Sequence, residues 1–163
     1  MVLCLSSTHL QALRNHAERA YPHECCGLLL GIKGASETQV MTVWATENAW
    51  TPTVEEHLAG SQATDMKHPH SQRDRYWIDP KDLLEAQRYA RDRHLNVIGV
   101  YHSHPDHAAV PSECDRSLAW AEYSYVILSV VQGCAQDLLC WCLDENHQFQ
   151  SEPLVVSPSA LPE

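Results

Sequence analysis

The sequence predicts a mixed α/β domain, of the α+β kind, in which a central mixed β-sheet is flanked by helices. Three observations support this fold class: apolar residues recur at helical spacing in two segments, short apolar runs have strand length, and turn residues separate them. A chain of 163 residues can bury a core without disulfide bonds. We expect a single domain over residues 1–156, with a polar insert at about 47–75 and a frayed tail over 157–163.

The N-terminal part predicts one helix and two strands. Thr8 and Gln11 have the spacing of a capping box, apolar residues follow every three or four positions, and Pro22 ends the pattern. The apolar run at 25–30 predicts the first strand. The alternating segment at 39–45 predicts a second strand that pairs with it.

The insert at 47–75 has a different character. It is polar, contains His57, His68 and His70, and shows no sustained periodicity. A stretch of this length without regular structure is usually functional or disordered, so we expect a mobile segment beside the functional site. His68 and His70 flank a proline, but no matching carboxylate pattern accompanies them, so they are not assigned as metal ligands.

Asp79 and Pro80 predict the start of the next helix, because Asp caps a helix and Pro suits its first turn. A short strand at 76–78 is expected before this helix, and the helix is expected to end near His94. Its buried stripe is predicted to consist of four residues: Leu83, Leu84, Gln87 and Ala90.

The C-terminal half predicts a strand at 97–101, a loop at 102–111 and a helix that Ser112 caps and that runs to about residue 122. Three further strands are expected at 125–131, 138–143 and 149–156, with turns at 132–133 and 144–146. Four aromatic residues are expected in the core: Trp120, Tyr123, Tyr125 and Trp141.

Composition narrows the classes of partner. A net charge of −10 argues against binding to nucleic acid or to an anionic membrane, because both require clustered basic residues. No secretory signal is visible, and no apolar run approaches the roughly 20 residues that span a bilayer. The seven cysteines form no CxxC pair, which favours buried thiols in a reducing cytoplasm. The oligomeric state stays open.

The residues that carry chemistry lie between positions 99 and 115. His102 and His104 are two residues apart, so on an extended chain both side chains point the same way. Asp115 lies in the first turn of the helix that Ser112 caps, and a helix packed against the strand would bring its carboxylate to them. Two histidines and one carboxylate leave a fourth tetrahedral position for water, which is typical of catalytic zinc. We predict one Zn²⁺ per chain, bound by His102, His104 and Asp115.

Two further residues are candidates for catalysis. Glu24 lies at the start of the 25–30 strand and is predicted to take a proton from the zinc-bound water. The hydroxyl of Ser112 either caps a helix, worth about 1 kcal/mol, or donates to the oxyanion of a tetrahedral intermediate. His23 and Glu24 do not begin a helical HExxH motif, because Gly27 stands where the second His belongs. Cys114 is expected to point away from the metal, about 100° from Asp115.

This pattern resembles the JAMM motif of the MPN-plus metalloproteases: His102-x-His104, seven residues, Ser112, two residues and Asp115, with Glu24 far upstream. The resemblance extends to 22–27, 78–80 and 123–131, and so covers most of the chain. It implies that the two histidines and Asp115 bind zinc, that Glu24 activates the water and that Ser112 stabilises the transition state. It also implies a fold similar to that of the cytidine deaminases.

The chain looks most like compact, stand-alone, mostly bacterial members of this family. That resemblance implies a zinc-dependent peptidase or isopeptidase that cuts after the C-terminal Gly-Gly of a ubiquitin-like or sulfur-carrier protein, releasing an amino acid such as cysteine. The long insert leaves the substrate open. One alternative is a catalytically silent MPN scaffold that binds protein partners. Another is a deaminase-like hydrolase, which is disfavoured because Pro105-Asp106 follows His104 and no CxxC pair exists.

Overall fold

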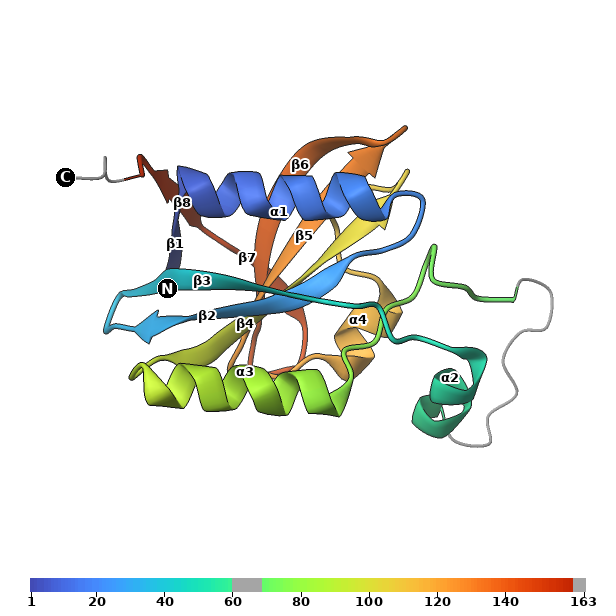
Figure 1. Cartoon of the computed structure of the whole chain (residues 1–163), viewed down its shortest axis with the longest axis horizontal. Coiled ribbons are helices and arrows are strands. Elements are labelled where there is room, and N and C mark those ends of the chain that lie inside the picture. Colours follow the sequence, from blue (N-terminus) through green and yellow to red (C-terminus); the bar gives the residue numbers. More distant parts are fainter. Residues whose placement is uncertain (60–68, 160–163) are drawn as a thin grey trace.

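The computed structural model describes residues 1–59 and 69–159, and these residues form eight strands and four helices (Figure 1). The elements in chain order are β1 (Val2–Ser6), α1 (Ser7–Ala20), β2 (Cys26–Lys33), β3 (Glu37–Thr46), α2 (Pro52–Ala59), α3 (Pro80–Asp92), β4 (Asn96–Pro105), α4 (Glu113–Leu118), β5 (Ser124–Val131), β6 (Cys134–Leu143), β7 (Phe149–Glu152) and β8 (Leu154–Ser157). None of the helices in this part of the chain is long and apolar enough to cross a membrane.

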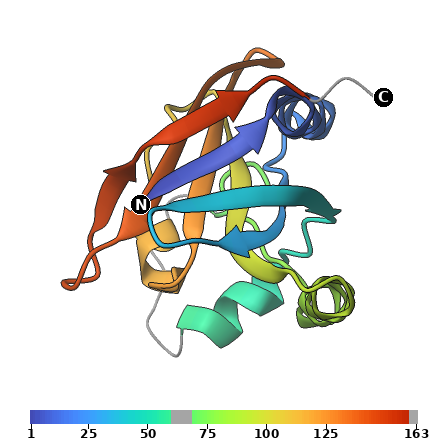
Figure 2. The ribbon, with the colours of Figure 1, turned by 90° about the vertical axis from the view of Figure 1, so that its left-hand side faces the viewer.

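The strands form one mixed sheet in the order β7-β6-β5-β4-β2-β3-β1-β8. Strand β1 is parallel to β3 and β8, and β4 is parallel to β5, whereas the other neighbours are antiparallel. Only Pro153 separates β7 from β8, so the two edge strands meet there and the sheet curls around α1 (Figure 2). The predicted fold class, a mixed sheet flanked by helices, is confirmed.

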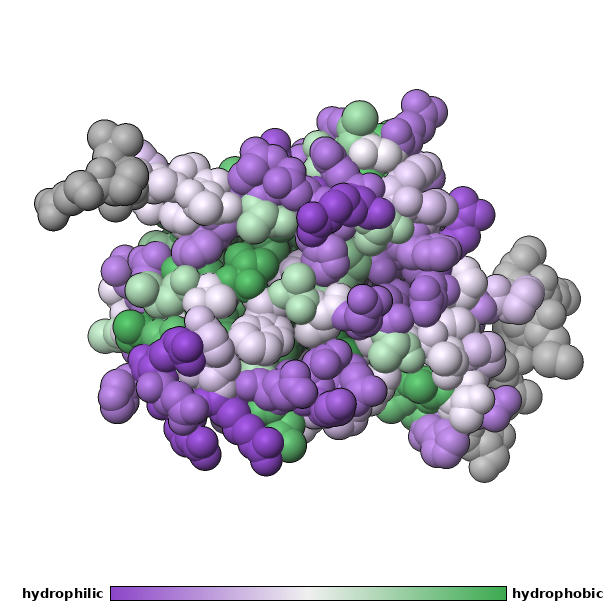
Figure 3. Space-filling view, in the orientation of Figure 1, coloured by the Kyte–Doolittle hydropathy of each residue, from purple (hydrophilic) through white to green (hydrophobic). Residues whose placement is uncertain are grey.

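Alternating side chains of the central strands supply a core on each face of the sheet. Leu29 of β2 and Tyr101 of β4 pack with Leu13 and Ala17 of α1 on one face. On the other face, the core contains four residues of the central strands and α3: Leu28, Val100, Ala86 and Ala90. Hydrophilic side chains cover most of the outer surface of α1 and of α3 (Figure 3). His102 continues the row of Val100, so it lies on the α3 face of the sheet.

Helix α1 is capped by Ser6 rather than by the predicted Thr8. The Ser6 hydroxyl accepts a hydrogen bond from the His9 N–H at 3.1 Å, and His9 Nδ1 accepts one from the Ser6 N–H at 3.3 Å. The predicted capping box was therefore wrong by two positions. Strand β1, which the sequence analysis did not expect, ends at Ser6, and the extended backbone of that residue suits a cap.

Helix α3 begins as predicted, because the Asp79 carboxylate accepts the Lys81 N–H at 2.8 Å and Pro80 opens the first turn. The predicted buried stripe was partly wrong. Leu84 is 45% exposed and Gln87 is exposed, whereas Ala86 and Ala90 are buried. Small alanine side chains let the helix backbone approach the sheet closely, so the face that contains them is the one that packs.

Strand β4 runs through both histidines to Pro105, so the loop predicted from residue 102 begins later. Strand β5 pairs with β4 along this extension, with His102 opposite Ile127, which explains its length. The helix after Ser112 ends at Leu118, earlier than predicted, and residues 76–78 form no strand. The turn at 132–133 is confirmed, with both residues at positive φ.

The insert and the tail differ from the prediction. The segment at 47–75 was predicted to have no regular structure, which was wrong for residues 52–59, because they form helix α2. Residues 60–68, which include His68, lie outside the described residues. In the tail, Ser157 pairs with Ser6, and the Ser159 hydroxyl accepts the Thr8 N–H at 3.0 Å. The predicted fraying was wrong for these residues, because β8 anchors them to β1.

Candidate metal centre

Strand β4 places two histidine side chains on the face of the sheet that α3 covers. His102 is fully buried and His104 is 8% exposed. Their Nε2 atoms lie 3.0 Å apart, as expected for residues two apart on a strand that turn the same atom inward. The convergence predicted for these two imidazoles is present in the structure.

Helix α4 supplies a carboxylate at the same point. Asp115 Oδ1 lies 3.2 Å from His102 Nε2, and Asp115 Oδ2 lies 3.3 Å from His104 Nε2. The three residues each offer one ligand atom, and these atoms lie within 4.8 Å of one another. In the described part of the chain they are the only such group of three or more. Cys114 does not belong to it.

Hydrogen bonds fix which nitrogen of His104 faces the group. His104 Nδ1 lies 2.8 Å from the Ala108 carbonyl, so it carries the proton and donates, leaving the Nε2 lone pair directed at Asp115. The His102 ring stacks on Tyr76 with centroids 4.5 Å apart and planes 25° apart. Two nitrogen lone pairs and one carboxylate suit a shared divalent cation, and such an N₂O donor set fits zinc better than calcium or magnesium.

The electrostatics favour the forms that bind metal. Burial lowers the pKa of His102, which keeps its imidazole neutral. Burial of Asp115 raises its pKa, but its contacts with the His102 and His104 imidazoles and with the Ser112 N–H outweigh this effect and hold the pKa below its usual range. Neutral imidazole and ionised carboxylate are the protonation states that metal ligands require.

The side-chain hydroxyl and the backbone N–H of Ser112 hold Asp115 in place. The Ser112 hydroxyl accepts the Asp115 N–H at 3.1 Å, and Asp115 Oδ2 accepts the Ser112 N–H at 2.7 Å. Ser112 is therefore the helix cap that the sequence predicts. Its side chain is exposed, and because it acts as an acceptor in the cap, its own O–H stays available as a donor. The role of that donor toward a substrate remains a prediction.

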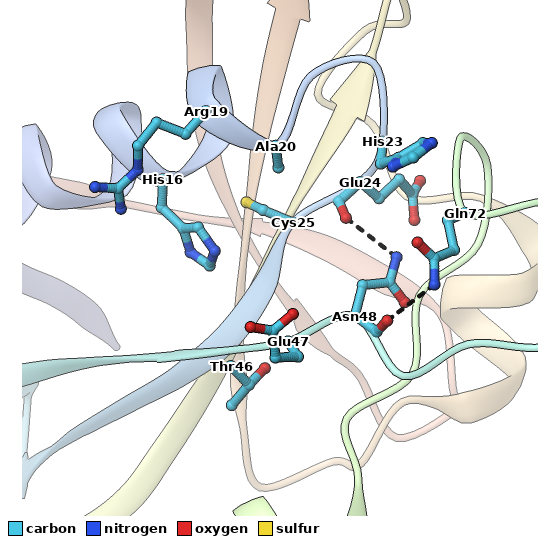
Figure 4. A pocket seen from close by; sticks show the side chains of 10 residues that line it. All are labelled: His16, Arg19, Ala20, His23, Glu24, Cys25, Thr46, Glu47, Asn48 and Gln72. Carbon is cyan, nitrogen blue, oxygen red and sulfur yellow. Dashed lines mark hydrogen bonds between the residues drawn. The ribbon is translucent and has the colours of Figure 1, made fainter.

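Glu24, two residues before β2, is a second buried carboxylate near the group and is only 6% exposed. Its backbone is held from both sides: its N–H donates to the Gln72 carbonyl at 2.7 Å, and its carbonyl accepts the Asn48 amide at 3.1 Å (Figure 4). The Gln72 amide in turn donates to the Asn48 carbonyl at 3.0 Å. These hydrogen bonds from the two ends of the insert fix the backbone of Glu24, and therefore the position from which its side chain extends.

Burial raises the pKa of Glu24 well above its ordinary value, with a further increase from the carboxylates of Asp115 and Asp74, while Arg75 opposes the shift. Glu24 and Asp115 line one small cavity of about 10 Å³, roughly the size of a water molecule. A carboxylate with a raised pKa beside such a cavity is suited to accept a proton from water.

Several residues that organise the site could not be identified from the sequence alone. Asn48, Gln72 and Tyr76 lie at the two ends of the insert, and their contacts with Glu24 and His102 span more than 20 residues. No local periodicity carries that information. At the described ends of the insert, Asn48 and Gln72 hydrogen bond to the Glu24 backbone, and a role for the insert as a whole stays a prediction. His70 does not belong to the group; its Nδ1 donates a hydrogen bond to the Asp74 carboxylate at 2.9 Å.

The sequence is similar to a family model and to two named proteins. The model of a family described as prokaryotic homologs of the JAB domain matches residues 6–142. A protein named desampylase from Haloferax volcanii is 30% identical over 135 residues, which cover 78% of this chain and 80% of the relative. Tail tip assembly protein K of Escherichia phage N15 is 26% identical over 108 residues, but these cover only 32% of that protein.

Two solution structures have the same fold. A protein from Desulfitobacterium hafniense superposes with a TM-score of 0.74 at 23% identity, covering 96% of this chain and 94% of the other. A protein from Salinibacter ruber superposes with a TM-score of 0.65 at 29% identity, covering 98% and 94%. The mixed sheet with its flanking helices is thus shared along nearly the whole length of both.

Proposed function

The chain belongs to the prokaryotic JAB family, and from that premise we propose that it is a zinc-dependent peptidase or isopeptidase of the JAMM type. Family membership and the relationship to desampylase support a JAMM-type hydrolase in general. The observation that carries the finer proposal is the convergence of His102, His104 and Asp115 beside the buried carboxylate of Glu24. Residues 1–156 are proposed to form one domain.

In the proposed mechanism the chain holds the ligands and moves a proton. His102, His104 and Asp115 would hold one Zn²⁺, and this ion would supply Lewis-acid chemistry that acidifies water and polarises the scissile carbonyl. Glu24 accepts the proton of the attacking water, for which its raised pKa suits it, and then delivers that proton to the leaving amine. The Ser112 O–H donates to the oxyanion of the tetrahedral intermediate while its oxygen keeps capping α4.

The proposed substrate is a ubiquitin-like or sulfur-carrier protein, cut after its C-terminal Gly-Gly. The resemblance of the motif to compact family members and the name of the Haloferax volcanii relative support this class. No nucleic-acid or membrane partner is proposed, because the net charge of −10 disfavours both. A location in the cytoplasm stays a prediction.

The test is hydrolysis of a carrier protein extended by one cysteine after its Gly-Gly, followed by mass spectrometry of the intact chain. We expect zinc-loaded protein to remove the cysteine, chelated protein to be inactive, and added zinc to restore activity. A His102→Ala/His104→Ala double variant is the matched control. A protein that binds the carrier without cutting it, with or without zinc, would instead be the silent scaffold.

A further inference from the structure

A second cavity, of about 280 Å³, lies on the α3 face of the sheet and is lined almost entirely by apolar and aromatic side chains. We call it the apolar pocket. Its lining includes Leu28, Val100 and Tyr125 from three neighbouring strands, Leu83 from α3, and Trp120 from the segment after α4. Its size is at the lower limit of ligand sites, so it suits a large side chain better than a cofactor.

The apolar pocket adjoins the metal centre. Tyr76 lines the pocket and stacks on the His102 ring. Leu118 at the end of α4 lines both the pocket and the small cavity that Glu24 and Asp115 share. Val100 and His102 are two residues apart on the same row of β4, which is about 7 Å along a strand. The pocket therefore begins two residues of extended chain away from the ligands.

One wall of the pocket is open to solvent. Trp120 is 71% exposed and Leu118 is 38% exposed, which contradicts the expectation that Trp120 belongs to the core. The Trp120 backbone is nevertheless fixed, because its N–H donates to the Tyr125 hydroxyl at 2.6 Å. An exposed aromatic side chain on a fixed backbone at the rim of an apolar pocket is suited to cover an apolar group that enters it.

We propose that the apolar pocket binds the side chain of the residue directly before the two C-terminal glycines of the substrate, and that it selects a large apolar residue there. This inference rests on the proposed function. With the scissile carbonyl at the metal centre, two extended glycines span about 7 Å, the same length as the step from His102 to Val100. The glycines have no side chains to fill the pocket, so the residue before them is the first that can.

The test measures kcat/KM for carrier proteins that carry Leu, Ala or Asp before the two glycines. The wild-type enzyme is expected to prefer Leu over Ala by about 10-fold or more, the discrimination typical of apolar pockets, and to disfavour Asp further. Trp120→Ala should lower kcat/KM for the Leu substrate toward the value for the Ala substrate, and so lose most of this preference. Leu139→Ala, which removes an apolar side chain that is 44% exposed and outside the pocket, is the matched control and should change neither.

Binding of the cleaved tails, measured by calorimetry, separates this inference from the proposed function. Turnover without any preference between Leu and Ala, or a preference that survives in Trp120→Ala, would overturn the inference and leave the proposed function standing. If the wild-type protein cuts nothing but binds the tail with Leu before its two glycines more tightly than the tail with Ala there, the result would support the pocket and refute the enzyme. Equal binding of both tails without turnover would refute both.

Discussion

The Ser112→Ala substitution separates the two roles of one hydroxyl. In the structure this hydroxyl accepts the Asp115 N–H at 3.1 Å, so its removal takes away a helix cap worth about 1 kcal/mol. A domain with a typical stability of about 5–15 kcal/mol stays folded after such a loss. Any large fall in kcat at constant folded population and constant zinc content must therefore come from a role of the hydroxyl beyond capping.

If the O–H donates to the oxyanion, we expect kcat to fall by about 10²–10³. The assay combines denaturant unfolding with hydrolysis of the carrier–cysteine conjugate, with zinc content measured on the same samples. Ser112→Thr keeps both the cap and the donor and serves as the control. Wild-type turnover in Ser112→Ala, together with a stability loss of about 1 kcal/mol, would show that Ser112 is a cap and nothing more.

Three other predictions follow from the same structure. His102→Ala and Asp115→Ala should each lose most of the bound zinc and lower the Tm of the metal-loaded protein, because metal binding is linked to folding; full zinc content by elemental analysis would contradict the ligand assignment. Ser6→Ala should cost about 1 kcal/mol in denaturant unfolding whereas Thr8→Ala should cost far less, and the reverse order would restore the cap predicted from the sequence. Burial raises the pKa of Glu24 in the folded protein, so ionisation of this carboxyl above about pH 4.5 favours the unfolded state. In the presence of a chelator, the free energy of unfolding of the wild type should therefore fall relative to that of Glu24→Gln as pH rises above about 4.5. Parallel pH profiles of the two free energies would refute the burial argument.

The elements that local patterns define were predicted well from the sequence. Asp79 and Pro80 mark the start of α3, and Ser112 marks the start of α4, because each cap depends on residues within one turn. The convergence of His102 and His104 follows from the two-residue repeat of a strand, which needs no tertiary information. The proximity of the two histidines could therefore be predicted from the sequence alone.

The errors occurred where contacts between distant segments decide the structure. Strand β1 exists because β3 and β8 pair with it on either side, and its own five residues carry little signal. The last predicted strand is divided at Pro153 into β7 and β8, which lie at opposite edges of the sheet. The chain can pass directly from one edge to the other because the sheet curls. Likewise Tyr76 and Asn48 reach the site through packing across the insert, which spacing along the chain does not reveal.

The central claim is that Glu24 moves the proton while His102, His104 and Asp115 hold the metal. Its most direct test is zinc content and turnover of Glu24→Gln, a change that keeps the shape of the side chain and removes the base. We expect zinc to stay near one per chain while turnover of the carrier–cysteine conjugate falls by about 10²–10⁴. Wild-type turnover in this variant, with zinc retained, would contradict the claim.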